Sequence, residues 1–67
     1  MTNTKLLEEY IEKSGYKRSY LAKALNITSY ALALKITNKS EFKASEINTL
    51  CTVLDIPVEG RMSIFFA

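Results

Sequence analysis

Segment 18–37, RSYLAKALNITSYALALKIT, most constrains how this chain can fold, because it holds two short helical patterns separated by residues that favour a turn. In the first pattern, Leu21, Ala22 and Leu25 form one apolar face at helical spacing. Asn26 follows the last of them, and Asn is second only to Gly at taking the left-handed conformation that ends many helices. The first pattern therefore predicts a short helix that stops at Asn26.

The second pattern begins directly after this turn. Thr28 is a good N-cap, because its hydroxyl can accept a hydrogen bond from a free backbone N–H of the first helical turn. Leu32 and Ile36 lie one helical turn apart and predict the buried stripe of the second helix. Thr37 and Asn38 offer the next stop. We therefore expect two helices joined by a tight turn, the arrangement of helix-turn-helix proteins.

The remaining sequence also favours helices. An apolar stripe at helical spacing predicts a first helix that Gly15 ends; the stripe consists of Leu6, Leu7, Tyr10 and Ile11. Phe42 and Ile47 are placed to form a hydrophobic staple at the start of a fourth helix, with Glu46 at its third position. The apolar face of that helix consists of Ile47, Leu50, Cys51 and Leu54.

Pro57 suits the start of a short fifth helix, because proline has no N–H to lose in a first helical turn. We expect its apolar residues to be Val58, Met62, Phe65 and Phe66. No segment shows sustained strand alternation. The predicted fold is therefore all-α, a compact bundle of about five short helices that forms a single domain over residues 1–67, with the two-helix motif at about 18–37.

The residues of the motif resemble those of the lambda-repressor-like family (Cro/CI, or XRE), and the chain is most similar to small phage-type members. The matching residues are Leu21-Ala22, Asn26, Ile27, Thr28 and Leu32. The resemblance implies a sequence-specific transcriptional regulator that places a recognition helix, about residues 28–37, in the major groove of double-stranded DNA. In the family an aliphatic residue is common where this chain has Lys35, and we expect Ile36 to take over its packing role.

Two sets of residues are expected to face DNA. On a helical wheel Tyr30, Leu34 and Thr37 point away from the core, with Ser29 and Ala33 on the flanks. The resemblance implies that base edges are contacted by Ser29, Tyr30, Ala33, Leu34 and Thr37. The candidate phosphate contacts are Lys17, Arg18, Ser19, Thr28, Lys35, Lys39 and Lys43, which would supply affinity without reading sequence.

A second interpretation of the same face remains open. The first two turns of the recognition helix offer no Arg, Gln or Asn, although these side chains make the strong bidentate contacts to bases. Instead they offer Tyr30 and Leu34, one turn apart, and Tyr is enriched where proteins bind one another. The alternative function is therefore a protein-binding modulator, such as a co-repressor or anti-repressor, that uses these two residues.

The charge distribution favours the DNA-binding interpretation. Residues 13–43 carry seven basic and one acidic side chain, a net charge of +6, whereas the other residues carry two basic and six acidic ones, a net charge of −4. A local positive field attracts polyanions even when the whole molecule is nearly neutral. A short palindromic DNA site also favours a homodimer.

The composition argues against an enzyme and against a cofactor. The chain has no histidine, one cysteine (Cys51) and two glycines. A zinc site, a nucleophilic triad and a glycine-rich phosphate loop therefore cannot be built in their usual forms, and we expect no metal or small-molecule ligand. No apolar run is long enough to span a membrane, and the lone cysteine suits a reducing compartment, so we expect a cytoplasmic protein.

Overall fold

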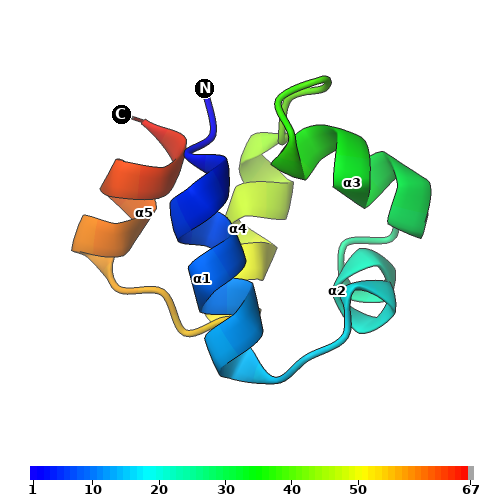
Figure 1. Ribbon diagram of the computed structural model, residues 1–67, viewed down its shortest axis with the longest axis horizontal. Helices are drawn as coiled ribbons and strands as arrows, with labels where there is room; N and C mark the ends of the chain where they lie inside the picture. The colour runs from blue at the N-terminus through cyan, green and yellow to red at the C-terminus, as the bar shows by residue number, and fades with distance from the viewer. Residues whose placement is uncertain (67) are drawn as a thin grey trace.

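Five short helices make up the computed structural model, which describes residues 1–66 (Figure 1). They are α1 (Thr4–Ser14), α2 (Arg18–Ala24), α3 (Ser29–Ile36), α4 (Ala44–Val53) and α5 (Val58–Phe65). Within this described range there is no β-strand. The expectation of an all-α chain with about five helices is confirmed. No helix of the described range is both long and apolar enough to cross a bilayer.

Side chains close to the helix ends explain where two of the helices begin. The Oδ1 atom of Asn3 accepts a hydrogen bond from the Leu6 N–H at 3.1 Å, and the Oγ1 atom of Thr28 accepts one from the Ala31 N–H at 3.0 Å. Each bond satisfies one backbone donor that the first helical turn leaves free. Thr28 is therefore the N-cap of α3, as its position in the sequence predicts.

Helices α2, α3 and α4 end in a common way. Each is followed by a residue with positive φ: 59° at Asn26, 66° at Asn38 and 54° at Asp55. The N–H of the next residue then donates to a carbonyl five residues earlier, at 2.9–3.0 Å, in the pairs Ile27 to Ala22, Lys39 to Leu34 and Ile56 to Cys51. These bonds are the closing bonds of Schellman motifs. Helix α1 ends at Gly15, with φ of 76°.

Helices α1 and α4 lie in the middle of the view, with α5 on one side and the α2–α3 pair on the other, and all five helices contribute side chains to the core (Figure 1). Its most deeply buried side chains are Leu7, Leu21, Leu32, Ile36, Leu50, Cys51 and Ile64. Burial raises the pKa of the Cys51 thiol above its ordinary value, although the nearby Arg61 guanidinium acts in the opposite direction. The thiol is therefore protonated at neutral pH and fills the core as a small apolar group.

Helix α5 packs differently from the sequence prediction. Ile64 and Phe65 are buried, and the Phe65 ring meets the Phe42 ring edge-on, with 5.5 Å between centroids. The predicted apolar residues Val58, Met62 and Phe66 are instead 71%, 56% and 60% exposed. The prediction for these three was wrong because apolarity alone cannot distinguish the inner side of a short helix from its outer side.

Candidate nucleic-acid interface

The α2–turn–α3 unit is held by its own apolar face and by a tight turn. Leu21 and Ala22 of α2 and Leu32 and Ile36 of α3 are buried in the shared core. The left-handed Asn26 reverses the chain between the two helices. The small side chain of Ala22 leaves room for α3 to approach α2 closely. Sequence spacing predicted these features correctly.

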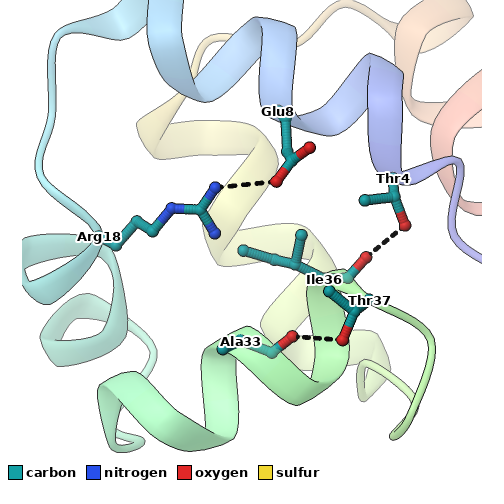
Figure 2. A network of polar contacts seen from close by, with 6 residues as sticks. All are labelled: Thr4, Glu8, Arg18, Ala33, Ile36 and Thr37. Carbon is teal, nitrogen blue, oxygen red and sulfur yellow. Dashed lines mark hydrogen bonds and ion pairs between the residues drawn. The ribbon is translucent and has the colours of Figure 1, made fainter.

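Helix α1 contacts both helices of this unit (Figure 2). The Thr4 hydroxyl donates a hydrogen bond to the Ile36 carbonyl, at 2.5 Å, near the end of α3. The Glu8 carboxylate pairs with the Arg18 guanidinium, at 3.0 Å, in the first turn of α2. One side of α1 therefore contacts the start of α2 and the end of α3.

The outer face of α3 is open to solvent over most of its length. Of the residues expected to contact bases, four are exposed: Ser29, Tyr30, Ala33 and Thr37. Tyr30 extends furthest, with 74% of its surface exposed. Leu34 is only partly exposed, so the expectation that it points away from the core is correct only in part.

Lys35 does not belong to the set of phosphate contacts in which the sequence analysis placed it. Its residue surface is only 8% exposed, and its Nζ atom donates to the Glu46 carboxylate at 2.8 Å and to the Glu41 carbonyl at 3.1 Å. The expectation that Lys35 contacts phosphate is therefore wrong. The reason is geometric: Lys35 lies beside Ile36 on the inner side of α3, where its aliphatic stem packs and its ammonium meets a buried carboxylate from α4.

Glu46 joins this pair to the start of α4. The same carboxylate oxygen that binds Lys35 also accepts a hydrogen bond from the Lys43 N–H at 2.8 Å. Burial by itself would raise the pKa of Glu46, but the hydrogen bonds from Lys35 and Lys43 and the positive charge of Lys35 outweigh it and hold the pKa below its ordinary value. The carboxylate is therefore ionised at neutral pH, and the Lys35 charge is matched within the core.

The other candidate phosphate contacts lie on the surface around the α2–α3 unit. All six are exposed: Lys17, Arg18, Ser19, Thr28, Lys39 and Lys43. A shallow hollow beside the turn brings Ser19 and Thr28 together with Ser29, the first residue of α3. Among these six, Arg18 alone forms a salt bridge in the described structure, with Glu8 of α1.

The comparison with protein families gives one match. Residues 2–67 match a family described as "Protein of unknown function (DUF739)". The chain belongs to the DUF739 family. No curated protein and no solved structure matches it.

Three further residues of this DUF739 protein lie on the surface of the unit although sequence reasoning did not select them. Lys23 is exposed in the last turn of α2 and lines the same hollow as Ser19 and Ser29. Tyr16 and Tyr20 stack with 4.9 Å between ring centroids, and both are largely exposed. Their spacing of four residues was the available signal, but Tyr16 precedes the helix, so a helical pattern did not include it.

Proposed function

We propose that the protein is a sequence-specific DNA-binding transcriptional regulator whose α2–α3 unit is a helix-turn-helix of the lambda-repressor-like type. One observation carries the proposal: the outer face of α3 is exposed while exposed cations lie at the start of α2 and after the end of α3. An α-helix with its side chains is about 10–12 Å in diameter, which fits a major groove about 12 Å wide, and α3 has eight residues to lie in it. The recognition helix of this proposal is α3 with its caps, Thr28 and Thr37.

The exposed cations and the outer face of α3 are expected to contact different parts of the DNA, the phosphates and the bases respectively. In this proposal phosphates are bound by exposed cations at the start of α2, Lys17 and Arg18, and around the loop after α3, Lys39 and Lys43. Ser19, Thr28 and Lys23 would add contacts beside the turn. Lys35 takes no part, because its charge is paired with Glu46.

The first test measures binding to DNA by fluorescence anisotropy. A duplex is selected from a random-sequence pool, and its affinity is compared with that of a scrambled duplex at about 50 and 200 mM salt. The expected result is preferential binding of the selected duplex, with affinity that falls steeply as salt rises. Lys17→Ala and Arg18→Ala should each weaken binding and lower the slope of log affinity against log salt by about one.

Lys5→Ala is the matched control, because Lys5 is an exposed lysine of α1 and its substitution removes the same charge from a helix outside the α2–α3 unit. It should change binding much less than the other two substitutions. Equal weak binding of every duplex, or equal effects of all three substitutions, would contradict the proposal.

The exposure of Tyr30 favours a second candidate function, a protein-binding modulator. A tyrosine that is 74% exposed is a suitable anchor for a partner protein. Leu34 would contribute less than the sequence indicated, since it is partly buried. In this case Tyr30→Ala should abolish the protein complex and leave any affinity for DNA intact, whereas a complex that survives this substitution would argue against the modulator.

We also propose that the regulator acts as a homodimer through α5. Val58, Met62 and Phe66 follow one another at intervals of four residues and are all more than half exposed. Met1, 88% exposed, belongs to the N-terminal segment that is attached to α5 by the hydrogen bond from the Asn3 N–H to the Ile64 carbonyl. Exposed Met and Phe side chains have no polar group to satisfy in water, so a second copy of this surface would remove them from solvent.

A further inference from the structure

The exposed side chains of α3 have a limited chemistry. Among Ser29–Ile36 and the C-cap Thr37, all of which the structure describes, the exposed residues are Ser29, Tyr30, Ala33 and Thr37. None of the four carries an amide, guanidinium, ammonium or carboxylate group. The only charged side chain of α3, Lys35, is turned into the core. The bidentate side-chain contacts that distinguish guanine or adenine are therefore not available from this helix.

The hydroxyl groups are also partly committed. The Thr37 hydroxyl donates to the Ala33 carbonyl at 2.8 Å, so its proton is used within the helix (Figure 2). At the N-cap, the Thr28 hydroxyl oxygen accepts from the Ala31 N–H. If Thr28 or Thr37 formed a hydrogen bond to a base, that bond would compete with the one that its hydroxyl makes at the end of α3.

The groups of α3 that remain free for a base are mainly apolar. Ala33 lies three residues after Tyr30 and four before Thr37, so these side chains are neighbours on one helical surface. They offer the methyl of Ala33, the ring of Tyr30 with its single hydroxyl, and the methyl of Thr37. A single hydroxyl can bond to several bases, so it distinguishes them less well than a bidentate group does. The cations that flank α3 indicate that the surface approaches a polyanion and does not face a purely apolar partner.

Thymine is the base whose edge fits this surface, because its C5 methyl is the one apolar group that the four standard bases display in the major groove. We infer that α3 reads its DNA site chiefly through thymine methyl groups, packed against Tyr30 and Ala33. This inference rests on the proposed DNA-binding function. It predicts a site rich in thymine at the positions under the middle of α3.

The experiment replaces thymine by deoxyuridine in the selected duplex. Deoxyuridine keeps every hydrogen-bonding group of thymine and lacks only the methyl group. Each contacted methyl that is removed should lower affinity about fourfold, the ratio expected for one buried methylene-sized group. Replacement of thymines outside the selected site is the matched control and should change affinity by less than about twofold.

Protein variants then separate direct contact from an effect on DNA shape. In Tyr30→Ser or Ala33→Gly, the decrease in affinity on deoxyuridine replacement should shrink, because the group that touched the methyl is gone. Lys39→Ala should weaken binding to both duplexes equally and leave their ratio of affinities unchanged. Circular dichroism of each variant is the check that its helices are retained.

The outcomes distinguish this inference from the function on which it rests. If no sequence is selected over the scrambled duplex, the proposed function fails. If a sequence is selected but its deoxyuridine form binds equally well, the function stands and the methyl-reading inference is overturned. It is also overturned if the decrease in affinity persists undiminished in both Tyr30→Ser and Ala33→Gly, since the methyl then acts through the DNA alone.

Discussion

Lys35 and Glu46 form an ion pair inside a domain that has only a small core, so each residue depends on the other. Removal of one partner of a buried pair leaves the other charge without compensation and costs about 3–5 kcal/mol. We expect Lys35→Met to lower the free energy of unfolding by about 3 kcal/mol, measured by urea denaturation. The double variant Lys35→Met/Glu46→Leu should recover part of this decrease, but not all, because Glu46 also accepts from the Lys43 N–H. No recovery would mean that the pair is not coupled.

The lowered pKa of Glu46 gives the domain a predictable response to acid. In the unfolded chain the carboxyl has its ordinary pKa, 4.5, whereas in the folded chain the pKa is lower. The contribution of Glu46 to stability is therefore fully present above the unfolded value and is lost as the pH falls through the folded value. Melting temperature measured from about pH 7 down to about pH 3 should fall more for the wild type than for Glu46→Gln. If the melting temperature fell equally for the wild type and Glu46→Gln, this acid response could not be assigned to Glu46.

Asn26 and Asn38 have the same backbone conformation but different surroundings. Glycine takes a positive φ without the strain that a side chain adds, so Asn26→Gly should stabilise the fold by up to about 1 kcal/mol. Asn38 is different, because its side chain accepts from the Thr2 N–H and donates to the Thr2 carbonyl, both at 2.8 Å. Asn38→Gly should bring no such gain. The stabilities of Asn26→Gly and Asn38→Gly are compared by thermal unfolding. Equal gains in stability would show that the contacts of Asn38 to Thr2 contribute nothing.

Among the elements, α1 influences α2 through one ion pair. The Glu8 carboxylate holds the Arg18 guanidinium and competes with any phosphate for it. If Arg18 binds phosphate as proposed, Glu8→Gln should raise affinity for the selected duplex several-fold at low salt, and more than Glu9→Gln does. Glu9 is the matched control, since it is an exposed glutamate of the same helix and no salt bridge involves it among residues 1–66. Equal effects of the two substitutions would show that only overall charge matters.

Local sequence signals predicted the ends of the elements well. Gly15, Asn26 and Thr28 act on backbone groups within a few residues, so their effect can be derived from the sequence alone. Interactions between distant elements could not be derived in this way. Lys35 was assigned to the surface because its partner, Glu46, is eleven residues away and belongs to another helix. For the same reason the outward orientation of Val58 and Met62 on α5 became visible only when the packing of α5 against α1 was known.

For the whole molecule, the exposed surface of α5 predicts an assembly that depends on concentration. Met62→Lys places a charge in the middle of this surface and should convert a dimer to a monomer, measured by sedimentation equilibrium. Tyr30→Ser is the control, because Tyr30 is a large exposed side chain on a different helix and should leave the mass unchanged. In a dimer, the two copies of α3 would bind DNA half-sites about 34 Å apart. Because a monomer binds only one half-site, Met62→Lys should also weaken binding to the selected duplex. A wild-type protein that is monomeric at all concentrations would exclude the α5 dimer.

The contacts of α1 with α2 and α3 also have a consequence for motion. Thr4 is bonded to the end of α3, and Glu8 to the start of α2, so neither helix can swing away without breaking a contact to α1. The three helices should therefore open together, as one cooperative unit in native-state hydrogen exchange. Immobilisation of α2 and α3 by a ligand would then slow exchange of the α1 amides, although α1 lies behind the exposed face. Binding at the exposed face of α3 would therefore be detected as slower amide exchange in α1, a helix that does not itself contact the ligand.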